Sequence, residues 1–212
     1  MDHKRIGDND TGLNTGGMGT IAPNPCYTDE IAKVCMETIF LPTINAMNAE
    51  GRPFTGCLYF GLMLTPNGPK VIEYNCRFGD PETQIVMELL SSDLVDIMEA
   101  IWNKDLANCP VEFHDGAAAC VIIASGGYPK SYKKGCEISG LNADGQYEGI
   151  SVYHAGTKLE DGKYLTSGGR VLGITARGAD LREALDKSYA AVEHITFEDA
   201  FHRTDIGAKC FK

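Results

Sequence analysis

Basic residues are scarce in this sequence, and long hydrophobic runs are missing from it. The 212 residues include 19 lysines and arginines against 29 aspartates and glutamates, a formal net charge of −10 at pH 7. A general nucleic-acid surface needs basic clusters that displace counterions, so we expect no nucleic-acid partner. No apolar stretch is long enough to span a bilayer and no signal peptide is evident, so we expect no membrane partner. The charge does not exclude an anionic substrate, because a local lysine or arginine pocket can lie within an acidic surface.

The eight cysteines show neither the pattern of a disulfide framework nor that of a metal site. There is no CxxC pair, and no group of Cys and His residues has the spacing of zinc ligands. Cys35 lies in an amphipathic run, and Cys57 and Cys120 lie in apolar runs, where a free thiol packs as a small hydrophobic group. The five histidines lack the spacing of a metal pair or a catalytic triad, so we interpret each as structural. These features indicate a reducing, cytoplasmic location.

The first 50 residues combine an unusual start with one helix. The segment DHKR is followed directly by GDNDTGLNTGGMG at 7–19, and this composition predicts a long loop over 7–25. No strand or helix fits upstream of that loop, so we expect the chain to begin inside a domain. Apolar residues recur at helical spacing from Asp29, and Pro42 is expected to kink or interrupt that helix.

The rest of the pattern predicts an α+β protein with two domains. Residues 56–65 and 70–75 are typical of two strands joined by the turn PNG, and residues 82–102 of one amphipathic helix. The composition shifts around residue 110, which predicts a first domain at 1–110 and a second at 111–212. The second domain is expected to be small and β-rich, with strands at 117–124, 150–154, 163–166 and 170–176 and a helix at 180–195.

The strongest chemical signal is the segment VIEYNCRFGDPE at 71–82. On a strand, side chains two residues apart share a face, so Glu73, Asn75 and Arg77 are predicted to project together. A carboxylate and an amide oxygen suit Mg²⁺, and a guanidinium suits a phosphoryl group or a carboxylate. The alternating residues Ile72 and Tyr74 are expected to face the core. The same spacing also fits a polar surface edge with a Glu–Arg pair.

A second signal lies near the N-terminus. Lys4 and Arg5 precede a loop with glycines at 12, 16, 17 and 19. Such a loop lets backbone N–H groups approach an anion, and the two cations add positive charge. It matches neither GxxxxGK[ST] nor GxGxxG, so neither a P-loop nor a Rossmann site is indicated. A glycine-rich loop without these motifs is also compatible with plain turns.

Together these segments resemble one enzyme family. They are DHKR, GDNDTGLNTGGMG, GLMLTPNGPKVIEYNCRFGDPETQ, VYHAGTKL, SGGRVLGITARG and RTDIGAK. Over residues 2–209 the chain resembles the C-terminal portion of the phosphoribosylamine–glycine ligase (glycinamide ribonucleotide synthetase) family, a branch of the ATP-grasp superfamily. NTGGMG combined with EYNCRFGDPE also distinguishes this family from biotin carboxylases, which share the E-x-N-x-R core.

The resemblance implies a reaction and a set of site residues. Members of the family ligate glycine to 5-phosphoribosylamine with ATP, giving glycinamide ribonucleotide, ADP and phosphate in purine biosynthesis. By this resemblance Glu73 and Asn75 bind Mg²⁺ or Mn²⁺, and Arg77 is the catalytic residue that stabilises the transferring phosphoryl group. The implied ATP contacts are Lys4, Arg5 and Asn14, and the implied contacts to glycine or phosphoribosylamine are Asp80 and Glu82.

The resemblance also implies an incomplete enzyme. The expected fold is the second half of an ATP-grasp domain, a mixed sheet with flanking helices, followed by a small β-rich C-terminal domain. The N-terminal substrate domain and the lid half of the ATP-grasp are missing, so we expect little or no activity from this chain alone. The missing half is the expected partner, because positioning supplies most of such catalysis.

One position departs from the wider superfamily, and two alternatives stay open. Many ATP-grasp enzymes carry another acidic metal ligand 12 residues before the E-x-N motif, where this sequence has Gly61. The first alternative is a fragment of another ATP-grasp ligase or carboxylase. The second is a non-catalytic interface domain, which a polar rather than apolar face toward the missing half would favour.

Overall fold

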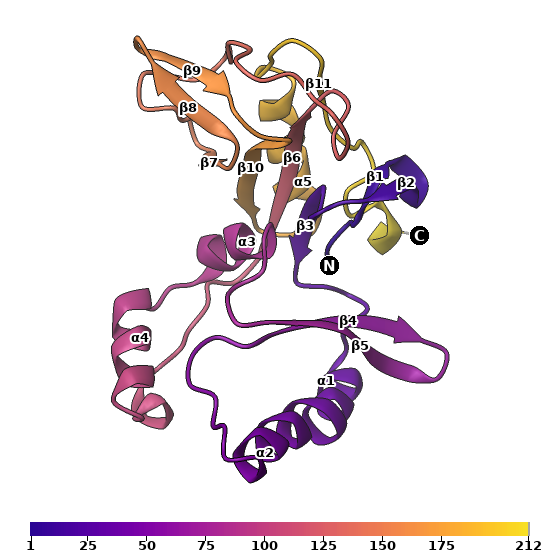
Figure 1. Cartoon of the computed structure of the whole chain (residues 1–212), viewed down its shortest axis with the longest axis vertical. Coiled ribbons are helices and arrows are strands. Elements are labelled where there is room, and N and C mark those ends of the chain that lie inside the picture. The colour runs from indigo at the N-terminus through magenta and orange to yellow at the C-terminus, as the bar shows by residue number, and fades with distance from the viewer. Residues whose placement is uncertain (212) are drawn as a thin grey trace. The chain divides into compact units, whose positions relative to one another are not determined.

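The computed structural model describes residues 1–211, which form two compact units of mixed α and β structure (Figure 1). Unit 1 contains Met1–Pro23, Asp80–Leu90 and the chain from His114 onward, and unit 2 contains Asn24–Gly79 and Ser91–Phe113. The α+β class is confirmed. Each unit combines segments that are distant in sequence, so a division into successive domains at 1–110 and 111–212 stays a prediction.

Unit 1 is built on a five-stranded antiparallel sheet. Its strands run in the order β11-β6-β10-β7. Strand β3 also pairs with β6, along Ala118–Val121, whereas β11 pairs with Ala124 and Ser125 of the same strand. The sheet strands are β3 (Gly19–Ala22), β6 (Ala117–Ser125), β7 (Ser151–His154), β10 (Arg170–Gly178) and β11 (Ala200–Phe201). The hairpins β1–β2 (Arg5–Gly7 and Thr11–Asn14) and β8–β9 (Thr157–Glu160 and Lys163–Thr166) and the helices α3 (Glu82–Leu89) and α5 (Leu181–Val192) complete the unit.

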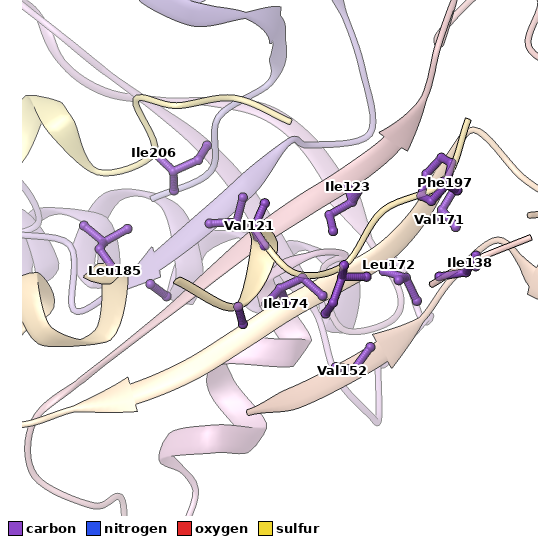
Figure 2. Packing of buried hydrophobic residues seen from close by; sticks show 14 of the residues in the cluster. Val121, Ile123, Ile138, Val152, Val171, Leu172, Ile174, Leu185, Phe197 and Ile206 are labelled. Atoms are coloured by element: carbon purple, nitrogen blue, oxygen red, sulfur yellow. The ribbon is translucent and has the colours of Figure 1, made fainter. Parts of the chain in front are cut away.

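Strand β6 is buried along its whole length because α5 and α3 both pack against it. Its side chains alternate between two hydrophobic clusters, as the pleat requires. Ala119, Val121 and Ile123 share a cluster with α5, while Ala118, Cys120, Ile122 and Ala124 share one with α3. Leu185 of α5 belongs to the first cluster, which continues into Leu172 and Ile174 of β10 (Figure 2). The continuous apolar run of β6 reflects burial on both faces.

Unit 2 consists of helices and one hairpin. Its elements are α1 (Asp29–Cys35), α2 (Leu41–Ala49), β4 (Tyr59–Thr65), β5 (Gly68–Asn75) and α4 (Leu94–Trp102). Helices α1 and α2 are joined by a π-helical turn, Met36–Phe40, in which the Leu41 N–H reaches the Met36 carbonyl. Pro42 has no N–H to donate, so the regular α-helical hydrogen bonding is interrupted, as the sequence predicted. The interruption takes the form of a wider π-helical turn, and the chain stays helical through it.

The single helix expected over 82–102 is wrong. Helix α3 ends at Leu89 and α4 begins at Leu94, and the two belong to different units. The Asp93 carboxylate accepts a hydrogen bond from the Val95 N–H at 2.7 Å and caps α4. Serine and aspartate favour such caps over helix interiors, and the Ser-Ser-Asp run at 91–93 supplies both.

The long loop expected over 7–25 is also wrong. Residues in this range form β2 and β3, and β1 begins just before it at Arg5. Strand β3 pairs with β6, with Gly19 opposite Val121 and Ala22 opposite Ala118. Its partner lies about a hundred residues away in sequence, so local composition carried no sign of the pairing.

The two units differ sharply in how much apolar surface they bury. Among the described residues, Cys35 is the one fully buried hydrophobic side chain in unit 2. All of the exposed large hydrophobic side chains except Leu13, Leu159 and Phe211 lie in unit 2. Unit 1 therefore has a core, whereas unit 2 has almost none. None of the described helices is long and apolar enough to cross a membrane.

Candidate functional site

The β4–β5 hairpin of unit 2 presents the two predicted metal ligands. Glu73 lies opposite Gly61 and Asn75 lies opposite Tyr59 in the antiparallel register. Both residues belong to β5 and are two positions apart, so their side chains share one face of the strand. The structure therefore places Glu73 and Asn75 as the sequence predicted.

Gly61 leaves room for the Glu73 side chain. A Cβ atom at position 61 would lie 2.7 Å from Glu73 Cγ, which is closer than real Cβ contacts allow. The absence of a side chain at this position thus lets Glu73 lie across β4, and an acidic residue there would displace it.

The donor set on β5 fits a hard cation that binds few protein ligands. A carboxylate and an amide oxygen are the types that Mg²⁺ prefers, and Mg²⁺ usually keeps waters or phosphate oxygens in its other positions. Among residues 1–211 there is no group of three or more His, Cys, Asp or Glu side chains that would hold a metal ion alone. Two protein ligands would leave the other positions of such an ion to waters or phosphate oxygens.

Arg77 does not share the strand face as expected. Strand β5 ends at Asn75, so the pleat does not set the direction of the Arg77 side chain. The Arg77 guanidinium donates to the carbonyl of Phe78 through Nη1 at 2.8 Å. Its catalytic role stays a prediction.

Ile72 and Tyr74, which were expected to face a core, are exposed. Ile72 is 60% exposed and Tyr74 is 51% exposed. The Tyr74 ring lies edge-on to Phe60 with centroids 5.3 Å apart, and Phe60 in turn contacts Phe40 at 4.5 Å. The strand itself was predicted correctly, but the expectation that Ile72 and Tyr74 face a core is wrong for unit 2.

In unit 1 the hairpin β1–β2 brings together two predicted ATP contacts. Arg5 lies directly opposite Asn14, and Arg5 Nη1 donates to the Gly12 carbonyl at 2.7 Å. Lys4 Nζ pairs with the Asp2 carboxylate at 2.6 Å. Lys4, Arg5 and Asn14 thus lie on or next to the β1–β2 hairpin, and Lys4 is already paired with Asp2.

The glycine-rich run is not an open anion-binding loop. The Gly16 N–H donates to the Tyr128 hydroxyl at 3.1 Å, and the Gly17 N–H donates to Thr15 Oγ1 at 3.0 Å. The Met18 N–H donates to the His3 carbonyl at 2.9 Å. These amides have acceptors within the protein, so the run is a structured junction.

A buried arginine holds the β1–β2 hairpin against the C-terminal segment. The Arg203 side chain is 1% exposed and donates to both oxygens of Asp205, at 2.7 and 2.8 Å. Its Nη1 atom also donates to Asp10 and to the Arg5 carbonyl, each at 3.0 Å. Burial opposes ionisation of Asp205, but the hydrogen bonds from Arg203 and from the Asn9 N–H, together with the Arg203 charge, outweigh it and lower the Asp205 pKa to about 2. The RTDIGAK segment therefore fixes the backbone that carries Arg5.

His3 and Asp2 are buried beside this hairpin. His3 Nε2 accepts from the Gly207 N–H at 3.1 Å, so its Nδ1 carries the proton and donates to the Gly19 carbonyl at 3.1 Å. Burial lowers the pKa of His3 to about 4 and raises the pKa of Asp2 to about 6. His3 is thus a neutral structural histidine, as the sequence indicated.

The predicted substrate contacts lie where α3 begins. Glu82 is the first residue of α3. The Asp80 carboxylate accepts from Arg170 Nη2 at 2.8 Å and from Gln84 Nε2 at 3.2 Å. A carboxylate has about four acceptor positions, so Asp80 retains capacity for further donors.

The sequence pattern assigned no role to Arg170 or Arg203, the two arginines that contact these segments. Arg170 belongs to SGGRVLGITARG and Arg203 to RTDIGAK, both of which carried the family resemblance. Arg170 contacts Asp80 across 90 positions and Arg203 contacts Asp10 across 193, so only the folded chain reveals these two contacts.

Comparison with known proteins gives a consistent assignment. The models of the ATP-grasp (A) domain and the C domain of phosphoribosylglycinamide synthetase match residues 1–83 and 118–209. The chain is 49% identical to the phosphoribosylamine–glycine ligase of Synechocystis sp. over 99% of its own length and 50% of that protein. It is 48% identical to the trifunctional purine biosynthetic protein adenosine-3 of Gallus gallus over 98% of this chain and 21% of that protein.

Solved structures agree. The crystal structure of phosphoribosylamine–glycine ligase from Thermotoga maritima matches with a TM-score of 0.83 and 37% identity, covering 97% of this chain and 50% of that one. The biotin carboxylase subunit of pyruvate carboxylase, with a TM-score of 0.58 and 18% identity, shares the fold alone. The chain spans about half the length of the phosphoribosylamine–glycine ligases that it matches. It belongs to the phosphoribosylglycinamide synthetase family, the ATP-grasp ligases of purine biosynthesis.

Proposed function

We propose that this chain is the metal-binding half of an ATP-dependent ligase that joins glycine to 5-phosphoribosylamine. The products are glycinamide ribonucleotide, ADP and phosphate. The observation that carries the proposal is the 49% identity to phosphoribosylamine–glycine ligases along nearly the whole chain. In this reaction ATP phosphorylates the glycine carboxylate, and the amine of phosphoribosylamine displaces phosphate from the acyl phosphate.

Glu73 and Asn75 are the proposed ligands of Mg²⁺ or Mn²⁺. A bound divalent ion would neutralise charge on the nucleotide phosphates during phosphoryl transfer. The shared face of β5 and the space above Gly61 support this role. Arg77, which follows the strand, is proposed to stabilise the transferring phosphoryl group with its guanidinium.

The remaining contacts are proposed on unit 1. Arg5 and Asn14 face each other across β1–β2 and would bind ATP, with Lys4 as a neighbour paired to Asp2. Asp80 and Glu82 would bind the amine of glycine or of phosphoribosylamine. Both acids lie at the start of α3, where Asp80 is held by protein donors and keeps acceptor capacity.

We further propose that the partner of this chain is the half of the ligase that it does not contain. Unit 2 exposes Ile72, Met63 and Tyr74 on its hairpin and buries almost no apolar side chain. Exposed apolar surface of this extent on a soluble domain marks an interface with another protein surface. A free-standing interface module with its own core, the second alternative, would not need such exposure.

Two further expectations concern the activity of the chain alone and its location. The 212 residues on their own should have little or no activity, because they span about half the length of the ligases that they match and such catalysis depends on positioning. A cytoplasmic location fits eight free cysteines and stays a prediction. A carboxylase of the same superfamily would accept biotin or bicarbonate in place of glycine.

The test is glycine-dependent ADP formation with phosphoribosylamine. The chain is assayed alone and mixed with the half of the Synechocystis ligase that it does not match. We expect activity from the mixture only, and none when bicarbonate replaces glycine. If the two halves associate and the mixture forms no ADP with glycine, the proposed function is wrong.

A further inference from the structure

Arg170 connects two segments that the sequence singled out for chemistry. Its Nη1 atom donates to the Gly16 carbonyl at 3.1 Å and to the Asp80 carbonyl at 3.0 Å. Its Nη2 atom donates to the Asp80 carboxylate at 2.8 Å. Gly16 belongs to the NTGGMG run and Asp80 to the GDPE segment, while Arg170 begins strand β10. All three residues lie in unit 1.

The fit around the guanidinium is close. A Cβ atom on Gly16 would lie 2.9 Å from Arg170 Cζ, so any side chain at position 16 would push the guanidinium away. The Gly16 N–H donates to the Tyr128 hydroxyl at 3.1 Å. Gly16 is therefore fixed through both its carbonyl and its amide by side chains of the C-terminal part of the chain.

The geometry requires an arginine. The planar guanidinium directs separate N–H groups to a carboxylate and to two carbonyls at once. A lysine ammonium is a compact donor on a flexible stem and would bond to one of these segments at a time. The Arg170 side chain is 18% exposed and Asp80 is 48% exposed, so the ion pair contributes little to global stability.

We propose that Arg170 is a positioning residue of the ligase, which holds the Asp80–Glu82 segment in the orientation that binds the amine substrates. The proposal rests on the proposed function and extends it to a residue of the C-terminal part of the chain. Arg170 acts through Asp80 and does not itself touch substrate. Because a small misplacement of a substrate-binding group costs a large factor in rate, the loss should appear in substrate use rather than in folding.

The variants that test this are Arg170→Lys and Gly16→Ala, with Arg177→Lys as the matched control. Arg177 lies on the same strand and is exposed. In the mixed-halves assay, Arg170→Lys should raise KM for glycine or phosphoribosylamine roughly tenfold and leave KM for ATP within about twofold. Gly16→Ala should reproduce the change because its Cβ displaces the guanidinium. The urea midpoint of unfolding should stay close to that of the unaltered chain.

A second measurement is independent of activity. Hydrogen exchange of backbone amides around 16–17 and 80–84, measured on this chain alone, should be faster in Arg170→Lys and unchanged in Arg177→Lys. Unchanged exchange in Arg170→Lys would overturn the positioning role. So would a KM for ATP that rises as much as the KM for the amine substrates, together with a lower urea midpoint of unfolding. If the unaltered mixture is inactive, the proposed function fails, and the exchange measurement still decides whether Arg170 fixes these segments.

Discussion

At the scale of single residues, the N-terminal segment carries two buried groups with opposite responses to pH. The pKa of His3 is lowered to about 4, so the folded state favours neutral His3 and this contribution to stability is lost as pH falls from about 6.5. The pKa of Asp2 is raised to about 6, so the folded state favours its protonated form and this contribution is lost as pH rises from about 4. Between about pH 4 and 6 the two contributions offset each other.

Replacing either Asp2 or His3 should reveal the pH dependence that the other residue gives to the free energy of unfolding. In Asp2→Asn, the free energy of unfolding relative to the unaltered chain should rise with pH by about 1.4 kcal/mol per unit between about pH 4 and 6. The relative free energy of His3→Gln should fall with pH over the same window. Urea unfolding at a series of pH values measures both differences. Parallel pH profiles for the unaltered chain and Asp2→Asn would refute the account.

Arg203 offers a second test at this scale. Replacing it with methionine leaves Asp205 and Asp10 without their buried donor and should lower the free energy of unfolding by about 3 kcal/mol. Adding Asp205→Asn should recover part of that loss, because the second change removes the uncompensated charge. Urea unfolding of the single and double variants gives the coupling energy. Additive effects would show that the pair does not interact.

At the scale of elements, the close approach of α5 to β6 depends on small residues. Ala119 is fully buried, and Ser188 of α5 donates to its carbonyl at 3.1 Å. Ala119→Leu should push α5 outward and lower the free energy of unfolding by about 1–3 kcal/mol. Ala190→Leu, on the exposed face of the same helix, should change it by less than about 0.5 kcal/mol. Thermal or urea unfolding checks both, and equal effects would mean that the helix is not seated as described.

The sequence predicted the elements whose signals are local and missed those that depend on distant partners. The strands at 117–124 and 170–176, the β4–β5 hairpin and the helix at 180–195 were all confirmed, since apolar periodicity and turn residues mark them. Strand β3 was missed because its identity comes from pairing with β6. The helix expected over 82–102 was wrong because a cap at Asp93 outweighed continuous apolar spacing.

The site shows the same division between local and distant signals. Glu73 and Asn75 were placed on one face because strand alternation is local. Arg77 fell outside the strand by two residues, a boundary that periodicity does not fix. The contact of Arg170 with Asp80 spans 90 positions and has no counterpart in the local sequence.

At the scale of the whole molecule, the central feature is the contrast between a unit with a core and a unit almost without one. Unit 2 carries the proposed metal ligands on a hairpin that leaves Met63, Ile72 and Tyr74 exposed. A domain that buries so little apolar surface has little to offset its conformational entropy. This contrast, together with the half-length match to the ligases, supports the proposal that the chain is one half of a catalytic unit.

The most direct test of that account is the rate of glycine-dependent ADP formation by the mixed halves when Glu73 is replaced by glutamine. Glu73→Gln keeps the size of the side chain and removes the charge that would bind the metal ion. We expect a loss on the order of a hundredfold or more, against a change within about twofold for Glu50→Gln, an exposed acid of the same unit. A mixture that keeps its full rate with Glu73→Gln would contradict the assignment of β5 as the metal-binding strand.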